Sequence, residues 1–138
     1  MVLAAAAFLA AGCGSPSDEL SYVKGSPDPV YYLGMKFEGL PLSSAVEFPD
    51  RWRRHEFPRA VPTVNVTYGS CPTTSRGSCR PGVSIITRKC GRAEAGVAIS
   101  ALDDERARRA AKRLQPLNAA ARGAGDPKRI SFGSEARC

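Results

Sequence analysis

Five cysteines carry the chemistry that is easiest to recognise in this sequence of 138 residues. A thiol can pair in a disulfide, ligate zinc or act as a nucleophile. Cys71, Cys79, Cys90 and Cys138 are separated by seven, ten and forty-seven residues, and the chain has a single histidine. These spacings lack the close pairs that hold a structural zinc ion or form a C-x-x-C redox site. We therefore expect disulfides and no metal ion, and the odd number of cysteines means that one has a separate role.

That separate cysteine is Cys13, which follows a short apolar segment. Residues 1–8 contain no charged side chain, and Leu9-Ala10-Ala11-Gly12 lead directly into Cys13. The stretch resembles a bacterial lipobox. The resemblance implies that residues 1–12 are a signal peptide, that Cys13 carries a diacylglycerol, and that the protein is held on the extracytoplasmic face of the cell membrane. The segment is shorter than the roughly 18 apolar residues that span a bilayer, but it has the length of a signal-peptide core.

The segment departs from the lipobox pattern at two places. Ala10 stands where leucine is usual, and the first basic residue of the chain is Lys24, so no positive charge precedes the apolar run. A true start upstream of Met1 would account for the missing charge. The alternative interpretation is an ordinary apolar N-terminus, or a cleaved signal peptide, in which Cys13 is incidental.

With Cys13 lipidated, four cysteines remain for pairing. A location outside the cytoplasm is oxidising, which favours two disulfides over free thiols. Cys71 and Cys79 flank a loop that contains Pro, Gly and Ser, so we expect them to pair at the tip of a hairpin. Cys90 and Cys138 then pair by elimination, which would fasten the C-terminal end of the chain to a strand.

The sequence contains few combinations of residues that could form a catalytic site. His55 is the only histidine, and no G-x-S-x-G nucleophile motif occurs. Gly123-Ala124-Gly125 leads into Asp126-Pro127 rather than into a phosphate-binding helix. Carboxylates such as Glu38, Glu47, Asp50 and Glu56 are present, but the sequence does not give their separations in space. We expect no cofactor, and a small enzyme with a site around His55 is an alternative to the leading hypothesis.

The chain is basic, with 20 Lys and Arg against 13 Asp and Glu, a net charge of +7 and a pI near 9.5. Positive charge attracts anionic partners, and behind a lipobox these are lipid headgroups or acidic envelope polymers rather than nucleic acid. The cationic segment Arg51-Trp52-Arg53-Arg54 could contact such an anionic surface. The favoured interpretation is plainer: Trp52 and Phe57 anchor a surface loop to the core, while the arginines stay in solvent.

Other patterns indicate the elements that position these residues. Residues 14–29 are rich in Ser, Pro, Gly and Asp, so residues 13–29 are expected to form the lipidated cysteine and a flexible tether. A single domain of residues 30–138 follows. Strands are expected where β-forming residues cluster or alternate, at residues 30–37, 64–68, 83–90 and 96–100, with a last extended piece at 129–132. Residues 40–44 are expected to lead into an irregular segment, which is followed by the proline-bounded segment of aromatic residues and arginines at 48–59.

One amphipathic helix is expected after the strand at residues 96–100. Ser100 to Asp103 has the character of a capping box, and acidic residues precede basic ones along the segment that ends before Pro116. One face carries apolar side chains at helical spacing: Ala107, Ala110, Ala111 and Leu114. The predicted fold is α+β, a small antiparallel sheet with one main amphipathic helix packed on it and disulfides that stabilise it.

Four short motifs also resemble small lipoproteins of actinomycete-type bacteria: Tyr31-Tyr32-Leu33-Gly34, Phe37-Glu38-Gly39-Leu40, Tyr68-Gly69-Ser70-Cys71 and Leu114-Gln115-Pro116-Leu117-Asn118. The resemblance covers residues 30–118. It implies a fold and a cellular location, but it does not imply an enzymatic reaction. We therefore expect a binding or structural module at the cell surface, attached to the membrane by a lipid and able to contact an anionic envelope polymer or a protein partner. The alternatives are the small secreted enzyme and a binder of anionic polymers or lipids.

Overall fold

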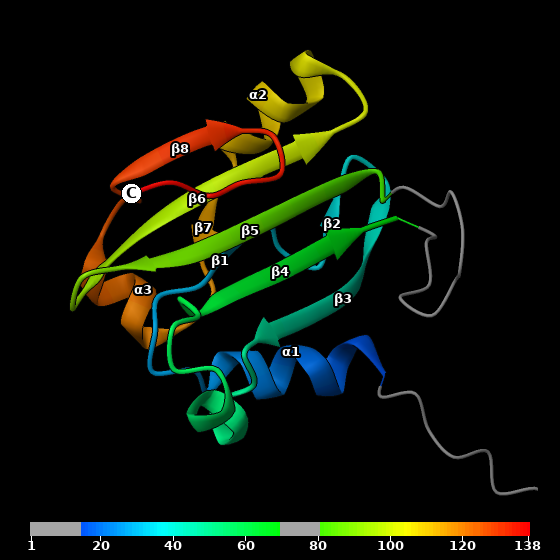
Figure 1. Ribbon diagram of the computed structural model, residues 1–138. Helices are drawn as coiled ribbons and strands as arrows, with labels where there is room; N and C mark the ends of the chain where they lie inside the picture. Colours follow the sequence, from blue (N-terminus) through cyan, green and yellow to red (C-terminus); the bar gives the residue numbers. More distant parts are fainter. Residues whose placement is uncertain (1–14, 70–80) are drawn as a thin grey trace, which may run out of the picture.

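The computed structural model describes residues 15–69 and 81–138. Its centre is a six-stranded sheet in the order β2-β3-β4-β5-β6-β8 (Figure 1). Neighbouring strands are antiparallel, except that β8 runs parallel to β6. The strands are β2 Lys36–Phe37, β3 Leu40–Phe48, β4 Thr63–Tyr68, β5 Val83–Cys90, β6 Glu94–Ala101 and β8 Arg129–Phe132. The predicted α+β class with an antiparallel-rich sheet is confirmed, whereas Cys13 and the expected Cys71–Cys79 pair lie outside the described residues.

Side-chain alternation divides the sheet into two faces. Along β4, Val64, Val66 and Tyr68 are buried, while the residues between them are only half-buried. We call the side of Val66 the core face and the opposite side, which carries Asn65, the outer face. Because the register of β4 with β5 is continuous, the same division extends along β5.

Helices and a short ribbon cover the core face. The helices are α1 Pro16–Lys24, α2 Asp104–Lys112 and α3 Ala119–Ala124, and the ribbon pairs β1 Tyr31–Tyr32 with β7 Gln115–Pro116. In Figure 1 the ribbon and α3 lie behind the sheet, with α2 at the top and α1 below. Helices α1 and α2 both have nine residues, so α2 is not the one main helix that the sequence predicts. No helix of the described ranges has the length and apolar character needed to cross a bilayer.

Helix α1 occupies the segment that is predicted to be a flexible tether, and that prediction is wrong. Ser15 caps the helix, Pro16 stands in its first turn, and the buried side chains of Leu20 and Val23 join the core. The Glu19 carboxylate accepts the backbone N–H of Ala45 at 2.8 Å, which ties α1 to β3. Ser, Pro and Asp are common both in linkers and at helix starts, so composition alone did not separate the two.

The segments around β3 also differ from expectation. The strand predicted at residues 30–37 is divided into β1 and β2 at Gly34, whose φ of 89° breaks the extended chain. Tyr68 stabilises this break, since its hydroxyl accepts the Leu33 N–H at 2.8 Å and donates to the Gly34 carbonyl at 2.9 Å. Residues 40–48, for which the sequence predicts no strand, form β3 with a register shift between Leu42 and Ser44. Pairing with β4 supplies the hydrogen bonds that the local sequence did not reveal.

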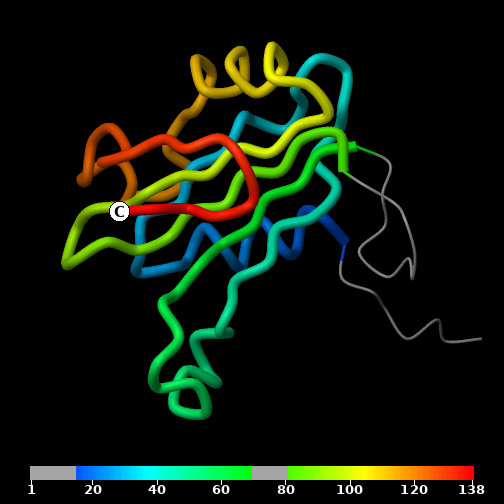
Figure 2. The backbone as a smooth tube through the Cα atoms, turned by 45° about the horizontal axis from the view of Figure 1, so that its top comes forward, coloured from blue at the N-terminus to red at the C-terminus, as the bar shows by residue number. Residues whose placement is uncertain are grey.

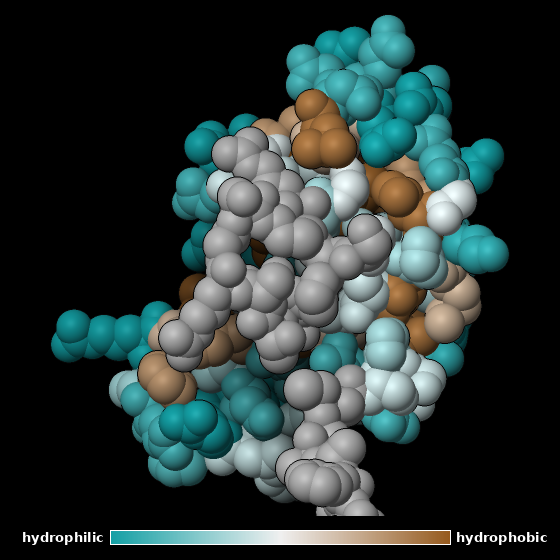
Figure 3. All heavy atoms as spheres, turned by 90° about the vertical axis from the view of Figure 1, so that its right-hand side faces the viewer, coloured by the Kyte–Doolittle hydropathy of each residue, from teal (hydrophilic) through white to brown (hydrophobic). Residues whose placement is uncertain are grey.

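Helix α2 forms where it is predicted but begins at a different cap. Asp103, rather than Ser100, accepts the Arg106 backbone N–H at 2.7 Å, because β6 continues through Ala101. Ala107 and Ala110 are buried in the core, which confirms that an alanine-rich face packs inward. Figure 3 shows hydrophilic side chains gathered at the top of the molecule, where α2 lies.

The last six residues, Gly133–Cys138, turn back after β8 and cross the outer face of the sheet (Figure 1); we call them the C-terminal strap. A disulfide joins Cys138 to Cys90 at the end of β5, with 5.7 Å between the Cα atoms. This confirms the pairing that the sequence predicts. Gly96 of β6 lies beneath the strap, where an added Cβ would stand 1.9 Å from the Arg137 carbonyl oxygen. A residue without a side chain is therefore needed at position 96.

Candidate functional site

The segment between β3 and β4 extends away from the body of the molecule (Figure 2). We call residues 48–57 the projecting turn; it contains the 3-10 helix η1 Arg51–Glu56. Asp50 caps η1 by accepting the Trp52 N–H at 3.0 Å, and it also accepts the Tyr22 hydroxyl at 2.7 Å. These two bonds, the one from Tyr22 foremost, keep the pKa of Asp50 below its usual value. The turn is thus attached to α1 through Tyr22.

A buried carboxylate supports the projecting turn from below. The Glu47 side chain is only 1% exposed and accepts Arg51 Nε at 3.1 Å and Arg54 Nη2 at 3.3 Å. The Ser26 hydroxyl donates a further hydrogen bond to Glu47 at 2.9 Å. A buried charge is tolerated only when it is paired and hydrogen-bonded. Glu47 meets both conditions because two arginines of the turn point inward.

A second carboxylate, Asp28, extends this cluster toward β5 and α3. It lies 2.8 Å from Arg54 Nη2 and 2.9 Å from Lys89 Nζ. Its backbone carbonyl accepts the Asn118 side-chain amide at 2.8 Å, and Asn118 is the N-cap of α3. We call Asp28, Glu47, Arg51, Arg54 and Lys89 the ion cluster. It links three segments that are distant in sequence, at Asp28, at residues 47–54 and at Lys89, and therefore fixes the base of the turn against the fold.

Arg51 has contacts beyond its carboxylate partner. Its guanidinium donates to the backbone carbonyls of Tyr22 and Gly25, both at 2.7 Å, and lies 4.2 Å from the centre of the Tyr22 ring. The two carbonyls belong to the C-terminal end of α1, where a positive charge is favourable. Arg51 is therefore a structural residue that joins the turn to the helix.

The aromatic side chains of the turn face the opposite way, toward solvent. Trp52 is 76% exposed, and Phe48 and Phe57 are exposed beside each other with their ring centres 5.3 Å apart. Arg53 pairs with Glu56 at 2.8 Å on the surface and lies 5.8 Å from the centre of the Phe57 ring. The expectation that Trp52 and Phe57 anchor the loop is wrong, and of the three arginines only Arg53 stays in solvent as expected. Arg51 and Arg54 point inward because they pair with the carboxylates of Glu47 and Asp28 beneath the turn. The aromatic side chains are exposed to solvent instead.

The residues predicted as a contact for anions are thus only partly brought together. Arg51, Trp52, Arg53 and Arg54 share the turn, but each of the three arginines already has a carboxylate partner. Their charge is largely neutralised within the protein. Trp52 is the member of the set that remains available to a partner.

The alternative site around His55 does not gather catalytic groups. His55 is 77% exposed, and its acidic neighbour is Glu56 at 4.0 Å. Glu47 belongs to the ion cluster, Asp50 is a helix cap, and Glu38 pairs with Arg106 and Arg109 of α2. The hydrogen bond from Arg109 lowers the pKa of Glu38. Over residues 15–69 and 81–138, no group of three or more His, Cys, Asp or Glu is arranged to hold a metal ion.

Sequence reasoning missed the residues that support the turn. Asp28 and Lys89 are far from Arg54 in the chain, and nothing in the sequence links them. The spacing of Glu47 and Arg51, four residues apart, is a usable signal, but it is expected for a helix and here bridges a strand end and a 3-10 helix.

The chain matches no protein-family model, and it shows no significant similarity to a curated protein or to a solved structure.

Proposed function

We propose that this protein is a lipid-anchored, extracytoplasmic binding module whose projecting turn rests on the membrane that holds Cys13. In this proposal residues 1–12 are the signal peptide, Cys13 carries the lipid, and Phe48, Trp52 and Phe57 enter the headgroup region. The observation that carries the proposal is the exposure of Trp52 on a turn whose base is fixed by a buried ion cluster.

The exposure of these aromatic rings supports a role in binding a partner surface. Large apolar side chains gathered on a surface indicate a contact site, and tryptophan favours the boundary between water and lipid because its ring is apolar and its N–H is polar. Glu47 and Asp28 hold the turn in one conformation. A pre-formed turn loses little conformational entropy when it binds, which suits a docking element.

The position of α1 favours the membrane as that surface. Cys13 precedes the cap residue Ser15 by two residues, a reach of about 7 Å for an extended chain. Helix α1 is about 13.5 Å long for its nine residues, and Arg51 contacts the C-terminal end of that helix. A lipid at Cys13 and the projecting turn would therefore stand near the two ends of one short helix. A bilayer that holds the first is within reach of the second.

Trp52 allows a direct test because it is the only tryptophan of the chain. The full chain with Cys13→Ala should leave the membrane fraction, since the lipid is its main anchor. When this variant is mixed with vesicles of phosphatidylglycerol and phosphatidylcholine, Trp52 fluorescence should shift to the blue and be quenched by bromine-labelled lipid tails.

A matched control distinguishes vesicle binding through the projecting turn from non-specific binding of exposed apolar side chains. Leu102 is also an exposed apolar residue, at 67%, and lies just before α2. In a vesicle pelleting assay, Trp52→Ala should reduce binding and Leu102→Ala should not. Equal loss in both variants, or Trp52 emission that is unchanged by vesicles, would refute the membrane contact. Membrane retention of Cys13→Ala after a high-salt wash would refute the lipid anchor.

A further inference from the structure

Three arginines meet around Gly96 on the outer face of the sheet. The strand register aligns Gly96 of β6 with Arg88 of β5 on one side and with Arg129 of β8 on the other. Arg137 of the C-terminal strap crosses the same point, because its carbonyl oxygen lies over Gly96. Since neighbouring strands are about 4.8 Å apart, the backbones of Arg88 and Arg129 are separated by only about 10 Å. The backbones of these three basic residues are therefore close together. Arg129 and Arg137 line one cavity beside the strap, and Arg88 lines a neighbouring one.

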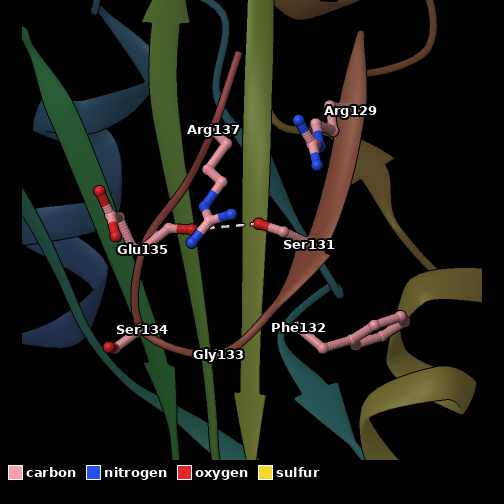
Figure 4. A pocket seen from close by; sticks show the side chains of 7 residues that line it. All are labelled: Arg129, Ser131, Phe132, Gly133, Ser134, Glu135 and Arg137. Atoms are coloured by element: carbon pink, nitrogen blue, oxygen red, sulfur yellow. Dashed lines mark hydrogen bonds between the residues drawn. The ribbon is translucent and has the colours of Figure 1, made fainter.

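These charges are not neutralised by the protein residues that the structure describes. No ion pair within residues 15–69 and 81–138 involves Arg88, Arg129 or Arg137. The neighbouring Lys128, in contrast, pairs with Glu94 at 3.0 Å. Glu135 belongs to the strap, but Figure 4 shows its carboxylate directed away from the Arg137 guanidinium, to the other side of the strap. Within the part of the chain that the structure describes, none of these three guanidiniums is thus paired with a carboxylate.

A cavity of about 310 Å³ lies between β8 and the strap. Arg129 and Arg137 line it, together with Ser131, Ser134 and Glu135 (Figure 4). In Figure 4 the Arg137 guanidinium extends from the strap toward Ser131, and the Arg129 guanidinium lies farther along β8 on the same side. Two guanidiniums that enter one cavity from facing segments present several N–H donors. Such donors suit an oxyanion with several acceptor oxygens, above all phosphate.

The walls of this cavity are held in place without a ligand. The Ser131 hydroxyl donates to the Glu135 carbonyl at 3.1 Å, and Arg88 Nη1 donates to the Ala136 carbonyl at 3.4 Å. The disulfide to Cys90 holds the end of the strap. Arg88 therefore acts as a positioning residue that bonds the strap, while Arg129 and Arg137 stay available.

We propose that this cavity is a binding site for a phosphate group, either a phosphate ester of a soluble or polymeric ligand or the phosphodiester of a lipid headgroup. Arg129 and Arg137 contact the phosphate oxygens, and Arg88 and the disulfide keep the strap at the correct distance. The site is separate from the projecting turn and does not depend on the function proposed for Trp52.

The test uses the full chain with Cys13→Ala, titrated with inorganic phosphate at low ionic strength in a calorimeter. We expect saturable binding at one site. Arg129→Gln and Arg137→Gln should each weaken it by about tenfold, because each removes a charge-assisted hydrogen-bond donor. The matched control is Arg122→Gln, which removes the same charge from an exposed position on α3 and should leave the affinity unchanged. A second measurement needs no arginine variant. In the Cys13→Ala chain, the NMR signals of the arginine Nε–H groups are followed as phosphate is added, and those of Arg129 and Arg137 should shift.

The source of the phosphate is decided with two further ligands, glycerol 3-phosphate and phosphatidylglycerol vesicles, in a chain that also carries Trp52→Ala. If Arg137→Gln lowers the binding of the vesicles, the phosphate is that of a lipid headgroup; if it lowers only the binding of glycerol 3-phosphate, the ligand is soluble. Both results support the site. Absence of saturable phosphate binding, or equal weakening by Arg122→Gln, would overturn it. Trp52→Ala should not change the phosphate titration, so failure of the membrane contact and failure of this site are distinguishable.

Discussion

The projecting turn and the C-terminal strap both bring arginines next to the sheet, but only the turn is supplied with carboxylates to receive them. Glu47 and Asp28 pair with Arg51 and Arg54 beneath the turn. At the strap, Arg129 and Arg137 have no such partner among the described residues. The comparison teaches that a run of arginines does not identify an anion-binding surface. What matters is whether the fold has already neutralised each guanidinium.

The two regions are also fastened by different means. The turn depends on ionic and hydrogen-bonded contacts, whereas the strap depends on a disulfide and on the space that Gly96 leaves. A change that loosens one region should therefore spare the other, and each region has its own readout, Trp52 fluorescence for the turn and phosphate binding for the strap.

The largest effect is expected when the strap is released. Cys138→Ser removes a disulfide that spans a sequence separation of 48 residues, so the free energy of unfolding should fall by about 4 kcal/mol in the chain-entropy model. Urea denaturation measures the loss, and a non-reducing peptide map of the parent should contain a linked Cys90–Cys138 fragment. Phosphate binding should weaken while vesicle-bound Trp52 fluorescence is retained. A loss below about 1 kcal/mol, or Cys90 linked to another cysteine, would contradict this account of the strap.

A somewhat smaller effect is expected at the base of the turn. Glu47→Gln removes the buried charge that two arginines share, and we expect a loss of about 3 kcal/mol, the lower end for a broken buried pair because the arginines are partly exposed. The matched control is Glu56→Gln, whose partner Arg53 lies on the surface; it should cost less than about 1 kcal/mol. Denaturation curves of the two variants test the difference. Equal losses would mean that the ion cluster does not hold the turn.

The smallest effect concerns acid and the cap of η1. The pKa of Asp50 is lowered from its ordinary value of 3.8, first by the Tyr22 hydroxyl and then by the Trp52 N–H. A depressed pKa in the folded state stabilises the protein above the unfolded value, and this contribution is lost as the pH falls through the folded pKa. We therefore expect the environment of Trp52, followed by fluorescence, to change below about pH 4. Asp50→Asn keeps a capping oxygen but does not titrate, so an identical acid transition in this variant would exclude Asp50 as its cause.

Local patterns predicted a good part of the sheet. The alternation of Val64, Val66 and Tyr68 is preserved because the core face needs an apolar residue at every second position. Helix α1 and β3 were not predicted, since the first begins with residues that also occur in linkers and the second depends on pairing with β4. In both elements the decisive contacts come from residues that are distant in the chain.

By itself, the sequence determined the α+β class, the strands β4, β5 and β6 and the alanine-rich face of α2, because each follows from a periodicity that does not depend on where the rest of the chain lies. The pairing of Cys90 with Cys138 was predicted by elimination among three possible connectivities, and the structure decided it. Only the tertiary structure decided which arginines are buried and which are available. Asp28 and Glu47 reach Arg54 from different segments, and Gly96 brings Arg129 and Arg137 together across two others. The sequence specifies which side chains are charged. Whether a charge is neutralised depends on the tertiary structure, because folding determines which opposite charges lie within a few ångströms of it.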